Sequence, residues 1–184
     1  DVYKRQVTFT ADLPINHKYY IKEIQAPDLY YMSNQVYEFT YKYKDDATYT
    51  YTFTHEFENK EVRGEVHVKK IDKDTNDFVS QGNASLDGAV YGLYAAEDII
   101  YPNKKTGIVY RKDELVAQGT IQEGKLDFKE LYLGKYYVKE ITPGEGYLLD
   151  ETEYPVTVDY EGQNVEIVHR DVTVKETVKK QAFW

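Results

Sequence analysis

Hydrophobic and polar residues alternate along most of the chain, in short runs that end at turn residues. A period of two places each kind of side chain on one face of a β-strand, so each run predicts a half-buried strand. Helical periodicity is not sustained anywhere, and at most a short helix fits near residues 111–118. Many short strands separated by turns predict an all-β sandwich or barrel. The predicted strands are residues 7–15, 18–24, 35–43, 47–57, 66–72, 86–95, 114–120, 126–131, 135–141, 154–160, 164–169 and 172–178, with a hairpin joining 154–160 to 164–169.

One strand motif occurs twice. Lys18–Ile24 (KYYIKEI) and Lys135–Ile141 (KYYVKEI) align without a gap at an offset of 117 residues, from 18 to 135. The polar stretch 58–64 separates the two copies and reads as a domain boundary. We therefore predict tandem domains, with residues 7–63 as the C-terminal part of a first sandwich and 64–178 as a complete second one. The chain is interpreted as a fragment of a longer array, in which the first sandwich is truncated at its N-terminus.

The two ends of the chain need separate interpretations. Residues 1–6 (DVYKRQ) match the translation of a transposon end used to prepare sequencing libraries, so we exclude them as an adapter artefact. Residues 179–184 are expected to begin a further domain.

Composition excludes several classes of function. The net charge of −9 argues against nucleic-acid binding, which requires a basic face. The chain has no cysteine, so it has neither disulfides nor a thiolate metal site. No long apolar run predicts membrane insertion in this fragment. The 20 tyrosines suit strands, because bulky side chains pack well on a pleated surface.

Signals for metals and cofactors are weak. Asp72–Asp77 resembles the start of a calcium loop, but the sixth position lacks Gly and the twelfth, Asn83, lacks Glu. The four histidines, at 17, 55, 67 and 169, show no ligand spacing. We therefore predict no cofactor and no metal.

In combination, four motifs resemble the prealbumin-like, Cna B-type domains of Gram-positive surface proteins, also called SpaA-like pilin domains. They are Glu58–Lys60 (ENK), Val68–Asp72 (VKKID), Leu86–Tyr94 (LDGAVYGLY) and Leu131–Glu140 (LYLGKYYVKE) closed by Gly146-Tyr147. The resemblance covers nearly everything from residue 7 onward. It implies tandem prealbumin-like β-sandwiches.

The resemblance also implies a spontaneous isopeptide bond. In such domains a Lys on the first strand joins an Asn or Asp on the last strand, and a buried Glu promotes the reaction. Burial favours a neutral, nucleophilic amine and a protonated carboxyl group that can pass its proton on. Carried over to the second domain, Lys70 is the amine and Glu140 the proton shuttle. Lys70 is preferred to Lys69 because Asp72 follows it by two residues.

The acceptor departs from the family pattern in the second domain. In the first domain Asn59 holds the acceptor position and Glu23 the shuttle position, but the strand that would carry the Lys is missing. The offset of 117 carries residue 59 to Glu176, an atypical acceptor. Asp171 is an alternative, although its parity along the strand predicts that it faces away from the Glu176 side.

The function implied is a structural stalk repeat of a cell-wall-attached adhesin or pilin. Its expected location is extracellular, and its expected partners are neighbouring repeats and, through another domain, host matrix or glycan ligands. It is not expected to be an enzyme beyond forming its own bond. The alternative is a ligand-binding module that uses the loop 96–113. A catalytic pair of Glu23 and Glu140 is disfavoured because they belong to separate repeats.

Overall fold

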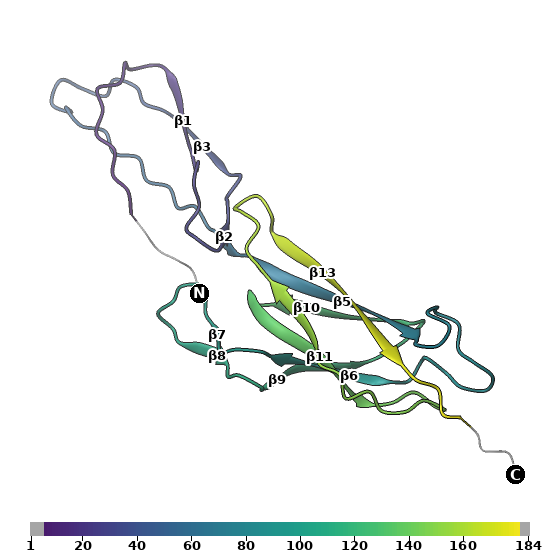
Figure 1. Cartoon of the computed structure of the whole chain (residues 1–184). Helices are drawn as coiled ribbons and strands as arrows, with labels where there is room; N and C mark the ends of the chain where they lie inside the picture. Colours follow the sequence, from purple (N-terminus) through teal and green to yellow (C-terminus); the bar gives the residue numbers. More distant parts are fainter. Residues whose placement is uncertain (1–5, 181–184) are drawn as a thin grey trace, which may run out of the picture. The chain divides into compact units, whose positions relative to one another are not determined.

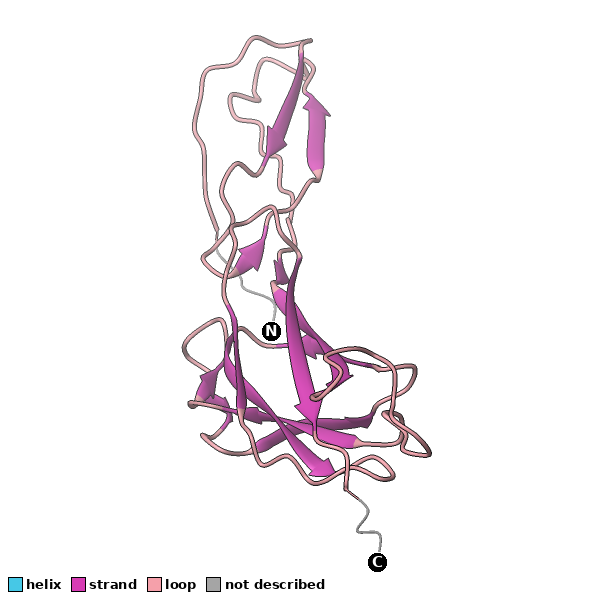
Figure 2. Cartoon of the chain, turned by 45° about the vertical axis from the view of Figure 1, so that its right-hand side comes forward, coloured by secondary structure: helices cyan, strands magenta, loops and turns pink. Residues whose placement is uncertain are grey.

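The computed structural model describes residues 6–180. Most of the predicted adapter segment 1–6 and of the predicted further domain 179–184 lies outside the described residues. Strands and loops make up the described part, which contains no helix (Figure 2). The chain divides into two compact units. Unit 1 comprises the residues up to Glu61 together with Gly162–Glu166, and unit 2 comprises Val62–Glu161 and the residues from Ile167 onward.

Unit 2 contains two main sheets, and all of their strands except β12 are labelled in Figure 1. The three-stranded sheet has the order β10-β5-β13, and β13 pairs with β5 in parallel. The four-stranded sheet has the order β12-β11-β6-β9 and is antiparallel throughout. A small hairpin, β7–β8, lies between β6 and β9 in the chain. The bounds are β5 (Arg63–Asp72), β6 (Val90–Ala95), β7 (Ile99–Ile100), β8 (Ile108–Tyr110), β9 (Leu115–Thr120), β10 (Lys125–Leu131), β11 (Gly134–Thr142), β12 (Tyr154–Val158) and β13 (Ile167–Glu176).

The core of unit 2 lies between these sheets. Alternate residues of β5 and β13 are buried, and so are alternate residues of β11. The layers approach closely: a Cβ on Gly64 of β5 would come within 2.3 Å of Val158 Cγ1 on β12. The buried apolar side chains include Val66, Val68, Tyr91, Leu93, Tyr136, Val138, Val158, Val172 and Val174. A β-sandwich with alternating inward residues is the predicted fold class, and it is confirmed.

Unit 1 contains two short antiparallel pairs. β1 (Lys18–Lys22) pairs with β3 (Val36–Thr40), and β2 (Tyr30–Tyr31) pairs with β4 (Lys60–Glu61). The predicted strands at 7–15 and 47–57 are wrong, since neither segment forms a ladder. The alternation in 47–57 still has a structural meaning, because its rings pack against those of β3 and of the residue after it. The ring pairs are Tyr37–His55, Phe39–Phe53 and Tyr41–Tyr51. Alternation predicted which side chains share a face, but not whether the backbone forms hydrogen bonds with a neighbouring strand.

Two further predictions are corrected in unit 2. Residues 164–169 and 172–178 were expected to be separate strands, but 167–176 is one continuous strand, β13. The expected hairpin with 154–160 does not form, because β12 and β13 belong to different sheets. The polar residues His169 and Asp171 interrupt the hydrophobic pattern without breaking the strand, since they lie on its exposed face. The short helix considered near 111–118 is replaced by β9.

The turn that follows the repeated motif has the same local structure in both units. The Tyr30 amide donates to the Pro27 carbonyl oxygen at 3.1 Å, and the Tyr147 amide donates to the Gly144 carbonyl oxygen at 3.1 Å. Tyr30 then bridges to Glu61, as Tyr147 bridges to Val178. Each pair of equivalents differs by 117 positions, so the sequence repeat is also a structural repeat.

Candidate functional site

Lys70 lies in the core of unit 2. β5 alternates between buried and more exposed positions, and this alternation directs Lys70 inward while the neighbouring Lys69 faces solvent. The Lys70 side chain is 0% exposed. A lysine amine is rarely buried in this way unless it has a specific partner.

The Lys70 amine lies beside a carbonyl oxygen, a carboxylate and an aromatic ring. Nζ donates to the Leu86 carbonyl oxygen at 2.9 Å and contacts the Glu176 carboxylate directly as an ion pair. It also lies 5.3 Å from the centre of the Tyr147 ring. Glu176 is the last residue of β13 and is likewise 0% exposed. The structure therefore brings together the predicted amine and the residue at the predicted, atypical acceptor position.

Burial shifts both groups toward their neutral forms. It lowers the pKa of Lys70, although the Glu176 carboxylate works in the opposite direction. It raises the pKa of Glu176, against the opposing effect of Lys70. Removing charged groups from water penalises the charged state of each. A neutral amine beside a protonated carboxyl group is the pair from which an amide can form.

Gly144 closes one side of the pair. Its amide donates weakly to Glu176 Oε1, at 3.4 Å. A Cβ at this position would lie 3.0 Å from Lys70 Nζ and 2.4 Å from the Ser85 carbonyl oxygen. Any side chain here would therefore disturb the space that the amine and carboxylate share.

Glu140, the predicted proton shuttle, is 4% exposed and lies on β11. Its Oε2 accepts a hydrogen bond from the Asp150 amide at 2.6 Å. Within the described part of the chain its buried Oε1 has no hydrogen-bond partner. Glu140 is opposite Tyr91 in the strand register, and burial raises the pKa of that fully buried Tyr91 hydroxyl, with a further contribution from the Glu176 charge. The role of Glu140 stays a prediction.

Unit 1 brings Glu23 and Asn59 together. Glu23 Oε2 accepts from Asn59 Nδ2 at 2.7 Å and from the Ser33 amide at 2.7 Å. The second bond is equivalent to that between Glu140 and Asp150, because each donor follows its Glu by ten residues. The predicted shuttle and acceptor of the first domain thus touch each other.

Asp171, the alternative acceptor, is placed elsewhere. It is exposed and lies opposite His67 in the register of β13 and β5, whereas Glu176 is buried. The structure agrees with the parity argument, because Asp171 and Glu176 occupy opposite faces of a strand that has no bulge.

Sequence reasoning missed the residues that hold this pair. Tyr147 was noted only as part of a turn motif, but its hydroxyl donates to Asp72 Oδ2 at 2.8 Å and its ring covers the amine. Asp72 Oδ1 accepts from the amides of Asp74 and Thr75 and from Gln81. The Asp72 carboxylate is therefore held by hydrogen bonds from the residues of the turn that follows it. In the sequence, the only signal for these supporting residues was the position of Asp72, two residues after Lys70.

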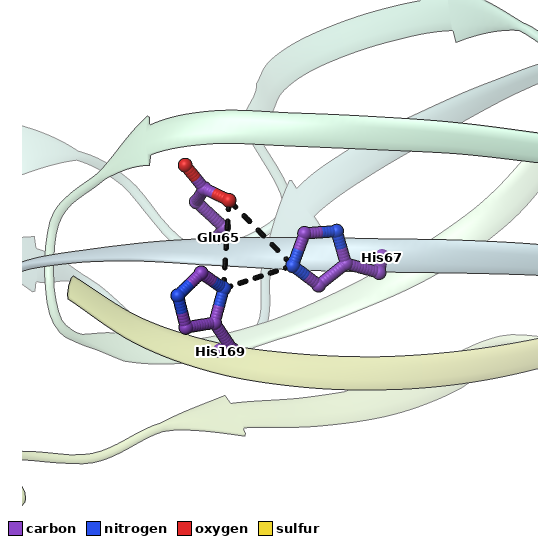
Figure 3. A group of neighbouring side chains, drawn as sticks. All are labelled: Glu65, His67 and His169. Carbon is purple, nitrogen blue, oxygen red and sulfur yellow. Dashed lines mark hydrogen bonds and ion pairs between the residues drawn. The ribbon is translucent and has the colours of Figure 1, made fainter.

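One cluster of metal-ligand side chains was also missed. Glu65, His67 and His169 gather on the outer face of the three-stranded sheet (Figure 3). The signal available in the sequence was Glu65 and His67 two residues apart on one face of a strand. His169 could not be joined to them without knowing that β13 pairs with β5.

The family of the second unit follows from its sequence. Residues 64–173, more than half of the chain, match the model of the SpaA prealbumin-like fold domain. The chain belongs to the SpaA family. The matched SpaA domain covers β5 except for its first residue and most of β13, and so contains Lys70 and Glu140. No curated protein matches the chain in sequence.

Several solved structures resemble this chain. The Bacillus anthracis TIE protein is 27% identical with a TM-score of 0.56, over 90% of this chain and 26% of that protein. The group B streptococcus pilus 2b backbone protein is 21% identical with a TM-score of 0.43, over 65% of this chain and 42% of its own. The Streptococcus agalactiae minor pilin GBS52 is 19% identical with a TM-score of 0.41, over 68% and 50%. This chain thus spans half or less of each of these proteins.

No helix among residues 6–180 has the length and hydrophobicity needed to cross a membrane.

Proposed function

We propose that this chain is part of the stalk of a cell-wall-attached surface protein or pilin, and that its second domain is tied by an amide between Lys70 and Glu176. The observation that carries the proposal is the buried contact between the Lys70 amine and the Glu176 carboxylate. A buried ion pair is weak support for stability, because desolvation offsets the attraction. An amide would explain why both residues are buried together, whereas an ion pair alone would not.

The reaction is a condensation. A proton first passes from the Lys70 ammonium to the Glu176 carboxylate, which leaves a neutral amine and a carboxylic acid. Lys70 Nζ then attacks Glu176 Cδ, the new N–C bond forms, and one C–O bond of the acid breaks. A second proton leaves Nζ and joins the departing hydroxyl, so that one water is released. Glu140 carries this proton in our proposal, because its Oε1 is buried and, within the described residues, unpartnered.

The link would have a mechanical consequence. β5 and β13 are parallel, with Arg63 opposite Ile167 and Asp72 opposite Glu176. The chain leads into β5 at its amino end and leaves β13 at its carboxyl end, so tension loads this strand pair in shear. A bond from 70 to 176 would let tension bypass the residues between them. It would close a loop of about 107 residues, worth roughly 4–5 kcal/mol by the chain-entropy argument used for disulfides.

The wider setting belongs to the same proposal. The stalk would lie outside the cell, attached to the wall and in contact with neighbouring repeats, while another domain contacts host matrix or glycan. Such a role is structural rather than enzymatic. The resemblance to pilus backbone and pilin structures prompts this setting, and the buried pair supplies a means of resisting tension.

The test is intact-mass measurement of the full chain. We expect the wild-type mass to fall short of the sequence mass by one water. Lys70→Met and Glu140→Gln should restore the full sequence mass, and a fragment spectrum should join the peptides that carry residues 70 and 176. Lys69→Met is the matched control, because its side chain is exposed on the same strand. A wild-type mass equal to the sequence mass would contradict the amide.

The ligand-binding alternative uses the loop 96–113. This segment is partly ordered by β7 and β8, Ile99 is 1% exposed, and Tyr101 packs edge-on against Tyr132 at 5.4 Å between ring centres. These contacts are those of a packed surface hairpin. The loop as a binding site stays a prediction.

A further inference from the structure

Three side chains converge on the outer face of the three-stranded sheet of unit 2. His67 Nε2 lies 3.0 Å from His169 Nδ1. Glu65 Oε2 lies 3.5 Å from each of these two nitrogens. Figure 3 shows the two rings and the carboxylate pointing toward one another. They form a nearly equilateral triangle of nitrogen and oxygen atoms.

The strand register produces this triangle. Glu65 and His67 are two residues apart on β5, so they share its outer face on either side of the fully buried Val66. The parallel pairing of β13 with β5 sets His169 directly opposite Glu65. All three side chains thus stand on the backbone of two paired strands. Sites built on strands hold their geometry better than sites on loops.

The spacing suits a small transition-metal cation. A tetrahedral zinc ion bound at about 2.0–2.1 Å has neighbouring ligand atoms about 3.3 Å apart. The three distances in the triangle fall on either side of that value, so an ion would fit with only small side-chain shifts. Two imidazoles and one carboxylate are ligands that zinc accepts, whereas calcium and magnesium prefer oxygen alone.

Asp127 supplies a second, independent observation. It stands opposite His67 on β10, and its Oδ1 lies 2.7 Å from His67 Nδ1. Metal-binding histidines commonly donate the other ring N–H to a carboxylate, which fixes the tautomer and raises the basicity of the ligating nitrogen. When Nδ1 donates to Asp127, the lone pair of Nε2 is directed toward Glu65 and His169. Glu65 and Asp127 also supply two negative charges near a divalent cation.

We infer that Glu65, His67 and His169 form a binding site for a divalent transition-metal ion of the zinc type, with Asp127 orienting His67. Side-chain exposure is 16% for Glu65, 27% for His67 and 58% for His169, so an ion can enter from solvent and keep a position for water or an external ligand. The bound ion joins β5 to β13. It does so at the Arg63–Ile167 end of the strand pair, whereas Lys70 and Glu176 meet at the other end.

The experiment uses the full chain without an affinity tag, freed of metal by dialysis against a chelator. Zinc is titrated in competition with a chromophoric chelator, and cobalt is added separately to record its visible absorption. We expect one zinc per chain and a cobalt spectrum of tetrahedral type. His67→Gln and His169→Gln should each weaken zinc binding by more than about 100-fold, and Asp127→Asn by about 10–100-fold. His17→Gln is the matched control and should bind as wild type, because His17 lies outside the cluster.

Two results would overturn the inference. One is the absence of saturable zinc binding up to millimolar concentration. The other is one-to-one binding that survives both His67→Gln and His169→Gln. Far-ultraviolet circular dichroism of each variant checks that the fold is kept, and His169 is exposed enough for its replacement to be tolerated. The outcome does not depend on the Lys70–Glu176 bond, whose presence is read from the mass alone.

Discussion

Lys70 meets Glu176 diagonally across β5 and β13, since the register pairs Lys70 with Val174 and Glu176 with Asp72. The long lysine side chain spans the two-residue stagger, and the pair is sealed from solvent. Two charges enclosed in this way can be kept as an ion pair or consumed in an amide. Replacing both residues by apolar ones should change the stability of the domain in opposite directions in these two states.

Replacing both members by apolar residues separates the two states. An isolated buried ion pair replaced by well-packed apolar side chains is often neutral, or stabilising by about 1–4 kcal/mol. Loss of an amide that closes the loop would cost about 4–5 kcal/mol. We therefore expect the variant Lys70→Met/Glu176→Leu to unfold at clearly lower urea concentration than wild type. A midpoint equal to or above wild type would indicate that no amide is present.

Gly144→Ala should disturb the same pair by steric pressure. The added Cβ would meet the Ser85 carbonyl oxygen at 2.4 Å, and backbone atoms cannot move aside cheaply. We expect a loss of about 1–3 kcal/mol in the free energy of unfolding, as for other overpacked sites. The mass spectrum should also show a larger unlinked fraction. The control is Glu145→Ala, whose exposed side chain should change stability by less than about 0.5 kcal/mol. Equal stability of the two variants would contradict the close approach.

Asp72 should make the fold sensitive to acid. Burial alone would raise the pKa of Asp72, but hydrogen bonds from the Thr75 and Asp74 amides, Tyr147 and Gln81 outweigh it and lower the pKa. The stabilisation that Asp72 contributes is therefore complete above its unfolded pKa of about 3.9, and it is lost as the pH falls through the lower folded value.

Urea unfolding of wild type and Asp72→Asn between pH 7 and pH 2 measures this effect. The variant should be less stable by about 2 kcal/mol at pH 7, because charge-assisted hydrogen bonds are lost. The difference should shrink below pH 4. A difference that stays constant down to pH 2 would show that the carboxylate has an ordinary pKa.

Tyr147→Phe tests whether the Tyr147 hydroxyl stabilises only the turn at Asp72 or also the pair of Lys70 and Glu176. The variant loses the hydroxyl that donates to Asp72 but keeps the ring beside Lys70. We expect a loss of about 1.5–3 kcal/mol, as for a hydrogen bond to a charged group, and unchanged formation of the amide. Intact mass and urea unfolding of the same sample measure both. A fall in amide yield would mean that the hydroxyl also acts on the pair.

Local features of the site could be predicted from the sequence. The spacing of two residues between Lys70 and Asp72 favoured Lys70 over Lys69, and the repeat offset leads from Asn59 to Glu176. The repeat likewise fixed Glu140 as the equivalent of Glu23, and both accept a hydrogen bond from an amide ten residues onward. These properties depend on near neighbours in the chain, so they can be read from short segments.

Pairing between distant strands could not be predicted in this way. Alternation says which way His169 faces, but not that its strand lies beside that of Glu65. For the same reason residues 154–160 and 164–169 were expected to form a hairpin, although the strands found there, β12 and β13, belong to different sheets. Residues 47–57 alternate as a strand should, yet their backbone makes no ladder. Long-range register is decided by packing among elements that no single segment encodes.

The separation of Lys70 and Glu176 along the chain also sets an order of events. β5 is made early and β13 late, so an amide between them cannot form until the last strand of the domain has been synthesised and has docked. A chain carried across a membrane in an unfolded state would travel without the bond and acquire it only on the far side. Because hydrolysis of a buried amide is slow, the bond would then persist, and its presence would show that the domain had folded at least once.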